Sequence, residues 1–117
     1  MQAAGLRRPF LEWTERTALG VLGRDHPDTL TTRNNLALFT AQAGDPAAAR
    51  DLVRELLPDR ERVLGRDHPN TLGTRNNLAL FTGEAGDPAA ARDLFRELLP
   101  DQERVLGRAH RKARVTR

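Results

Sequence analysis

Cysteine, serine, tyrosine and isoleucine are all absent from the 117 residues of this chain. Without cysteine there is neither a disulfide framework nor a thiolate metal site, so stability has to come from packing alone. The missing serine and cysteine also remove the usual hydroxyl and thiol nucleophiles, and the threonines show no grouping with histidine and aspartate. The composition therefore predicts a protein that is not an enzyme.

Long apolar runs are lacking as well. The first twenty residues carry five charged side chains where a secretion signal needs an apolar run, and no later stretch has the length and hydrophobicity of a membrane span. Cytoplasm is the expected location. The formal net charge is +3, and basic and acidic residues alternate along most of the chain. This mixture is typical of a solvated surface.

What the sequence does contain is an internal repeat. Residues 21–62 match residues 63–104 at all but six positions, and a match of this quality in register indicates a repeat architecture. The differing pairs are Asp28/Asn70, Thr31/Gly73, Ala41/Gly83, Gln42/Glu84, Val53/Phe95 and Arg60/Gln102.

Partial copies flank the two complete units. A third copy opens at Val105 and decays where Ala109 and Arg111 replace aspartate and proline. Residues 1–20 take the place of the second half of an earlier copy, and their Phe10 and Trp13 are expected to pack over the first complete unit. We therefore divide the chain into a degenerate half-repeat helix (1–20), two units (21–62 and 63–104), and a truncated third repeat with a basic tail (105–117).

Each unit predicts two helices. The first begins near Pro27 and is closed by Gly44, and the second is capped by Asp45, with Pro46 in its first turn. Pro58 lies inside the second helix, where we favour a bent continuous helix to about Leu64 over a break. The predicted buried positions recur at helical spacing; they are Leu30, Leu36, Ala37, Leu38, Phe39, Ala41, Ala43, Leu52, Val53, Leu56 and Leu57.

The candidates for chemistry have simpler structural explanations. His26, His68 and His110 recur at the repeat period and so lie apart, which favours capping or turn packing over a metal site. Asp25 and Asp67 are interpreted as helix caps rather than catalytic acids. No glycine pattern matches a phosphate-binding loop. We expect no metal and no cofactor.

The C-terminal end is basic. Such a tail could attract nucleic acid through counterion release, but no aromatic residues for base stacking are interleaved with it. A solvated, frayed end is the preferred interpretation, and nucleic acid is not the expected partner. The basic positions are Arg108, His110, Arg111, Lys112, Arg114 and Arg117.

The repeat resembles the tetratricopeptide repeat. The features that carry this resemblance are Leu36-Ala37 in the first helix and Ala49 followed by Val53 in the second. The phrases Leu-Gly-Arg-Asp-His-Pro-Asp-Thr-Leu and Arg-Asn-Asn-Leu-Ala-Leu look more narrowly like the kinesin-light-chain-like branch, which is abundant in actinobacterial proteins. Threonine stands at positions 40 and 82 where the family usually has a bulky aromatic residue. The resemblance implies an all-α, right-handed solenoid of about five helices.

The resemblance also implies a concave groove, lined by the first helix of each unit, that holds a peptide or a partner protein. Asparagine amides suit such a groove because they offer both donors and acceptors to a peptide backbone; the alternative is that Asn35 and Asn77 only bond a neighbouring helix. Arg33 and Arg75 could recognise carboxylates, although a solvated face is preferred. The implied groove residues are Thr31, Asn34, Asn35, Leu38, Gln42, Gly73, Asn76, Asn77, Leu80 and Glu84.

The sequence thus predicts an interaction module for an unidentified protein or peptide. The alternative is a structural fragment of a longer repeat array with no ligand of its own. Two complete units with imperfect ends leave apolar surface uncovered, so weak self-association through these ends is also expected.

Overall fold

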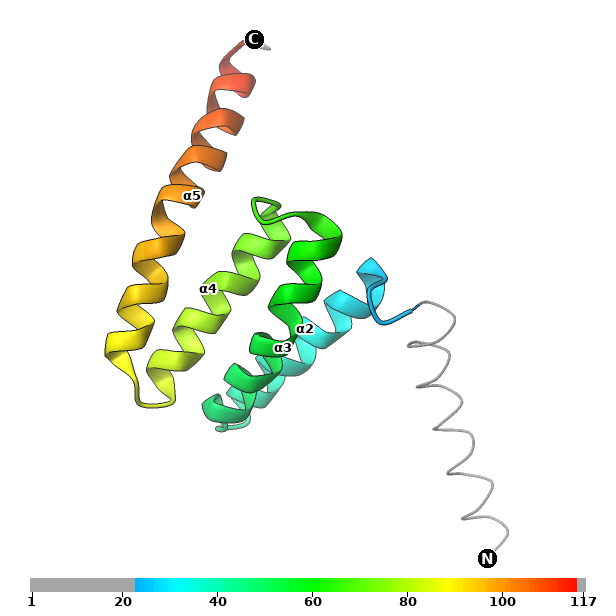
Figure 1. Cartoon of the computed structure of the whole chain (residues 1–117), viewed down its shortest axis with the longest axis vertical. Helices are drawn as coiled ribbons and strands as arrows, with labels where there is room; N and C mark the ends of the chain where they lie inside the picture. The colour runs from blue at the N-terminus through cyan, green and yellow to red at the C-terminus, as the bar shows by residue number, and fades with distance from the viewer. Residues whose placement is uncertain (1–22, 116–117) are drawn as a thin grey trace, which may run out of the picture.

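The computed structural model describes residues 23–115, with side chains described for residues 23–108. This part of the chain is built from four α-helices: α2 (Pro27–Gln42), α3 (Pro46–Leu64), α4 (Pro69–Glu84) and α5 (Pro88–Val115). Each helix packs against the next one along the chain, so that two helix pairs stack side by side (Figure 1). The predicted all-α solenoid of helix pairs is confirmed, whereas the helix predicted in residues 1–20 lies outside the described residues.

The first helix of each pair begins at a histidine cap. His26 has an extended backbone and its Nδ1 atom accepts a hydrogen bond of 3.1 Å from the Asp28 amide, while His68 bonds the Asn70 amide in the same way at 3.0 Å. This confirms capping as the role of these two histidines; the side chain of His110 lies outside the described part. Proline follows each cap and suits the first turn, because it has no N–H to leave unpaired.

The aspartate caps predicted just before these helices are wrong. Histidine, not aspartate, occupies the cap position next to the proline, and Asp25 and Asp67 instead form ion pairs with Arg62 and Arg104. The prediction holds one helix later, where Asp45 accepts a hydrogen bond of 3.1 Å from the Ala48 amide at the start of α3.

Glycines with positive φ separate the helices. Gly44 (φ 99°) follows α2 and Gly65 (φ 95°) ends α3, conformations that residues with a Cβ atom seldom adopt. Pro58 lies inside α3 and Pro100 inside α5, as expected for continuous helices.

At the C-terminal end, α5 runs on to Val115, although a ragged tail was expected there. Gly107 lies within this helix, whereas its equivalent Gly65 stops α3. The sequence after Gly107 explains the difference, since Ala109 and Arg111 replace the aspartate and proline of the earlier copies. Without the proline, which disfavours a helical residue before it, nothing prevents the helix from continuing.

The core lies where the two pairs meet. Ala37, Ala49 and Val53 of the first pair enclose Leu78 and Phe81 of α4. The closely packed alanines let the neighbouring helices approach, and the larger side chains fill the space between them. Leu52 and Leu57 pack against this cluster and Leu56 is fully buried, which confirms the predicted apolar face of α3.

One part of the predicted core is wrong. Leu36 and Phe39 of α2 are 55% and 68% exposed, while their repeat equivalents Leu78 and Phe81 are 8% and 3% exposed. Ala43 is exposed too. The residues that bury Leu78 and Phe81 belong to the preceding pair, and α2 has no such pair before it among the described helices.

No helix in the described residues combines the length and hydrophobicity that crossing a membrane requires.

Candidate functional site

The side chains implied for the groove recur on one face of α2 and one face of α4. Thr31, Asn35 and Gln42 are exposed on α2, and Leu80 and Glu84 are exposed on α4. Gly73 of α4 is exposed too, and the remaining members are half-buried: Asn34 and Leu38 on α2, Asn76 and Asn77 on α4. Leu38 packs against the core cluster, so its availability to a ligand is partial.

One pair of groove asparagines joins the two helices. The Asn77 Nδ2 atom donates a hydrogen bond of 3.3 Å to the Asn34 Oδ1 atom, across the boundary between the repeats. For Asn77 this matches the simpler alternative, in which the amide bonds a neighbouring helix. Asn35 forms no side-chain hydrogen bond within residues 23–108, and neither does Asn76. These two amides keep their donors and acceptors for other partners.

Arg33 and Arg75 do not lie on a solvated face. The Nη1 atom of Arg33 donates a hydrogen bond of 2.7 Å to the Oδ2 atom of Asp59, and Arg75 bonds Asp101 at the same distance. Each arginine thus clamps the first helix of its pair to the second. The carboxylate that the guanidinium fork recognises is within the chain, so these arginines are not available for a ligand.

The clamp also sets the charge state of Asp59. The hydrogen bond from Arg33 is the main cause that holds the pKa of this carboxyl below its ordinary value of 3.8, with Arg62 adding to the effect against the opposing effect of burial. Arg75 lowers the pKa of Asp101 in the same way. Both aspartates therefore stay ionised in the folded chain at a pH where the unfolded chain begins to take up protons.

Acidification is expected to destabilise the fold through these aspartates. Because their folded pKa values are depressed, their contribution to the free energy of unfolding is fully present above the ordinary pKa of 3.8. This contribution is lost as the pH falls below 3.8 and through the folded pKa values. Asp59→Asn should cost about 1–2 kcal/mol near pH 7 and less near pH 3. Urea unfolding followed by circular dichroism at both pH values measures this, with Asp51→Asn on the exposed face of α3 as the control. An equal loss at both pH values would contradict the clamp.

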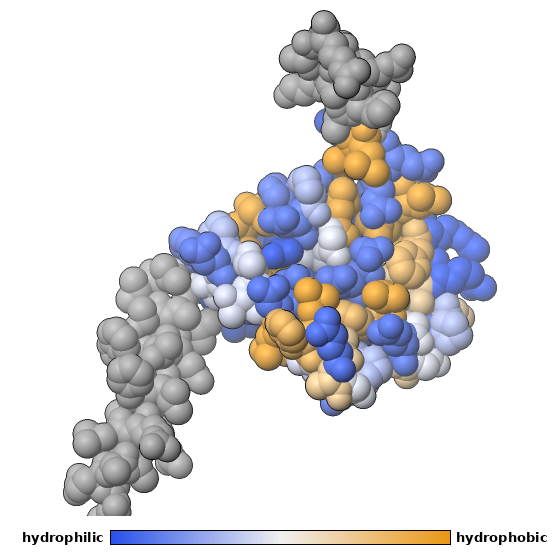
Figure 2. All heavy atoms as spheres, turned by 180° about the vertical axis from the view of Figure 1, so that it is seen from behind, coloured by the Kyte–Doolittle hydropathy of each residue, from blue (hydrophilic) through white to orange (hydrophobic). Residues whose placement is uncertain are grey.

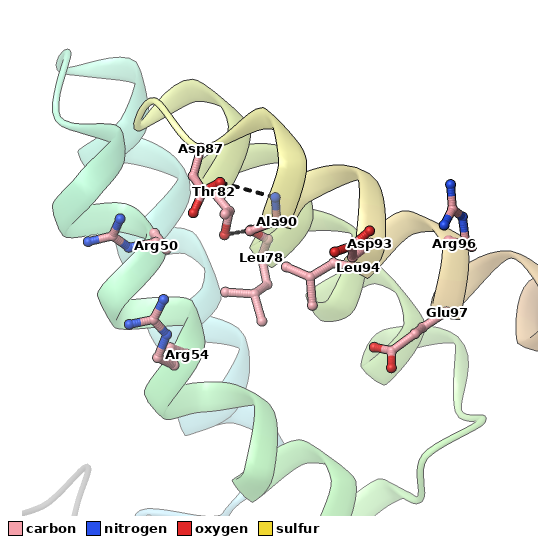
Figure 3. Close-up of a pocket in the computed structure, with 10 residues that line it drawn as sticks. All are labelled: Arg50, Arg54, Leu78, Thr82, Asp87, Ala90, Asp93, Leu94, Arg96 and Glu97. Atoms are coloured by element: carbon pink, nitrogen blue, oxygen red, sulfur yellow. Dashed lines mark hydrogen bonds between the residues drawn. The ribbon is translucent and has the colours of Figure 1, made fainter.

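A cleft of about 580 Å³ opens between the second helices of the two pairs. Arg50 and Arg54 of α3 form one wall, Asp93 and Glu97 of α5 form the other, and Leu78 of α4 lies at the bottom (Figure 3). The polar groups at its upper end are already bonded locally: the Thr82 hydroxyl donates to the Leu78 carbonyl oxygen at 2.6 Å, and the Asp87 carboxylate accepts from the Ala90 amide at 3.1 Å.

This cleft could not be predicted from the sequence, because it forms between repeats from residues far apart in the chain. Its α3 wall carries Arg50 and Arg54, whose guanidinium groups point away from α5, and its α5 wall carries the mixed charges of Asp93, Arg96 and Glu97 (Figure 3). No group of three or more histidine, cysteine or acidic side chains placed to hold a metal occurs within the described part of the chain. We therefore take the groove face, and not this cleft, as the candidate site.

Together these features define a class of protein. Stacked antiparallel helix pairs, joined by repeated caps and clamps and carrying an accessible polar face on their first helices, make a helical-repeat solenoid. The family model of the tetratricopeptide repeat matches residues 28–104, most of the chain, and the chain belongs to this family. Among curated proteins no similar sequence is found. Tetratricopeptide repeats are in general non-catalytic protein–protein interaction modules.

Proposed function

We propose that the chain binds a peptide or a segment of a partner protein in the groove formed by α2 and α4. The observation that supports this best is the presence of accessible amides at Asn35 and Gln42, on a face where the helices are already fixed by the Asn77–Asn34 bond. A peptide backbone presents alternating donors and acceptors, and side-chain amides supply both. The groove residues therefore suit an extended segment of chain.

The charge of the groove restricts the class of peptide that it can bind. Thr31, Asn35 and Gln42 are uncharged, and Glu84 is the one charged residue of the implied set. The arginines Arg33 and Arg75 are held by aspartates. The proposed ligand is therefore a largely uncharged segment, with a basic side chain preferred where it passes Glu84. We also infer that the chain belongs to the kinesin-light-chain-like branch of the family, from the 42-residue spacing of its units.

Selection from a peptide-display library on the immobilised chain tests this proposal. Peptides that bind should lose about tenfold or more in affinity for Asn35→Ala/Gln42→Ala, which corresponds to about 1.4 kcal/mol. Both side chains are exposed, so circular dichroism should show an unchanged helix content.

The control variant is Arg54→Ala, which changes an exposed residue of the α3 cleft wall. Its affinity for the selected peptides should equal that of the unmodified chain. Peptides that bind the double variant as tightly as the unmodified chain, or that lose affinity only with Arg54→Ala, would show that the groove assignment is wrong.

A further inference from the structure

The interface between the two repeats provides a template for a second interface. Inside the chain, Leu78 and Phe81 of α4 insert between α2 and α3, against Ala37, Ala49 and Val53. This apolar contact connects one helix pair to the next. The chain contains two copies of the inserting residues, on α2 and α4, and two copies of the residues that receive them. Within one chain, only the inserting copy on α4 meets a receiving copy, the one on α2 and α3.

The unused first half is on α2. Leu36 and Phe39 are the repeat equivalents of Leu78 and Phe81, and both are more than half exposed. Two large apolar side chains one helical turn apart on an exposed face are costly to leave in water.

The unused second half is between α4 and α5. A hollow of about 470 Å³ lies there, and the groove residues Leu80 and Glu84 are part of its lining, together with Pro88 and Arg92. Its other four residues, Ala79, Gly83, Ala91 and Phe95, are the repeat equivalents of Ala37, Ala41, Ala49 and Val53. Figure 2 shows apolar side chains exposed on the surface of α5, where Phe95, Leu99 and Leu106 are exposed. The hollow is thus the counterpart of the site that receives Leu78 and Phe81.

Polar groups repeat the same pattern. Asn77 and Asn34 bond across the internal interface, and their repeat equivalents, Asn35 and Asn76, are the two amides without a side-chain hydrogen bond in the described part. One lies beside the open face of α2 and the other beside the open hollow on α4. They are placed to form the same bond between two chains, so a second copy and the peptide proposed above would compete for the Asn35 amide.

We propose that a second copy of this chain is the occupant of the hollow, with Leu36 and Phe39 of one copy inserting between α4 and α5 of the next. A second copy is favoured over other occupants because α2 and α4 differ at only four positions, Asp28/Asn70, Thr31/Gly73, Ala41/Gly83 and Gln42/Glu84. The contact joins two different surfaces. It is therefore a head-to-tail interface, which leaves one open face at each end and extends with concentration.

Two variants, each with one inactivated face, test this arrangement. Phe39→Asp removes the inserting face and Phe95→Asp removes the hollow. Light scattering after size exclusion should give a mass that rises with concentration for the unmodified chain, and the 13.0 kDa of one chain for each variant alone. A mixture of the two variants should give twice that mass, because one intact face of each kind remains. The expected loss of affinity is at least tenfold per substitution.

The controls distinguish a specific loss of association from unfolding of the chain and from a general effect of a changed surface charge. Circular dichroism verifies that each variant keeps its helices, and Leu99→Asp replaces Phe95→Asp if the latter unfolds. Arg96→Glu should associate like the unmodified chain, because its repeat equivalent Arg54 stays exposed although α4 packs on α3.

Three outcomes would overturn the proposal. An unmodified chain that stays at the mass of one chain at every concentration means that residues 1–22 or nothing occupies these faces. Phe39→Asp that still dimerises alone means that α5 pairs with α5. Folded variants that do not combine when mixed mean that the two faces do not meet.

Discussion

Phe81→Ala is expected to lower the free energy of unfolding by about 3–5 kcal/mol, whereas Phe39→Ala should lower it by less than about 1 kcal/mol. The two residues occupy equivalent positions in nearly identical helices. Phe81 is almost completely buried in the cluster formed with Ala37, Ala49 and Val53, while the ring of Phe39 is mostly in water. The substitution therefore leaves a cavity in one helix and none in the other.

Urea unfolding at low protein concentration measures both losses, so that association between chains contributes little. The substitutions Leu78→Ala and Leu36→Ala test the same difference independently. Leu78→Ala, in α4, should again cause the larger loss of unfolding free energy. A domain of this size has little stability to spare, so a fully unfolded Phe81→Ala agrees with the prediction. Equal losses in the two helices would mean that Phe39 is covered by another part of the chain in solution.

The helix boundaries followed from local chemistry. Proline in the first turn at Pro27 and Pro46, and a positive φ at Gly44, depend on neighbouring residues only. The sequence therefore contains what is needed to place these boundaries. The identity of the cap residue does not follow from the sequence alone, because histidine and aspartate are adjacent and both can accept a hydrogen bond from the helix N-terminus.

Burial, in contrast, could not be predicted from a repeated sequence. Leu36 and Leu78 stand in the same local sequence, and periodicity assigns both to the core. Which of them is buried depends on whether a helix pair precedes it in space. That information is in the order of the repeats and not in the residues around each leucine.

The candidate site shows the same limit. Its residues were implied by the resemblance to the family, and the spacing of Thr31, Asn35 and Gln42 agrees with one side of a helix. The bond between Asn34 and Asn77 and the clamp from Arg33 to Asp59 could not, since each joins residues from separate helices. Side chains with several possible partners are assigned only when the packing between helices is known.

Arg60 is the clearest case of a residue whose role required the structure. It is one of the six positions that differ between the repeats, and its side chain is 6% exposed. Its Nη1 atom donates to the Asn70 carbonyl oxygen at 3.0 Å and to the Thr74 Oγ1 atom at 2.9 Å. Within the described residues no carboxylate pairs with it, and burial lowers the pKa of its guanidinium below the ordinary value.

Arg60→Ala is expected to cost about 2–4 kcal/mol, because it removes the buried stem and both hydrogen bonds between α3 and α4. Arg60→Met should cost less than about 1 kcal/mol or be stabilising, since a flexible apolar side chain fills the same space without bringing a charge out of water. Urea unfolding of both variants measures the difference, and an exposed arginine of the same helix, Arg54→Ala, is the control.

Comparing the losses of unfolding free energy in Arg60→Ala and Arg60→Met separates the effect of side-chain packing from that of the charge at the contact between the repeats. If Arg60→Met were as damaging as Arg60→Ala, the two hydrogen bonds to α4 would dominate the contribution of this residue. The expected result instead assigns most of the contribution of Arg60 to stability to the volume of its side chain. In that case Gln102, at the equivalent position on the open face of α5, keeps part of the volume and a donor amide without a buried charge. A second chain could then pack on α5 at a smaller desolvation cost than α4 incurs on α3.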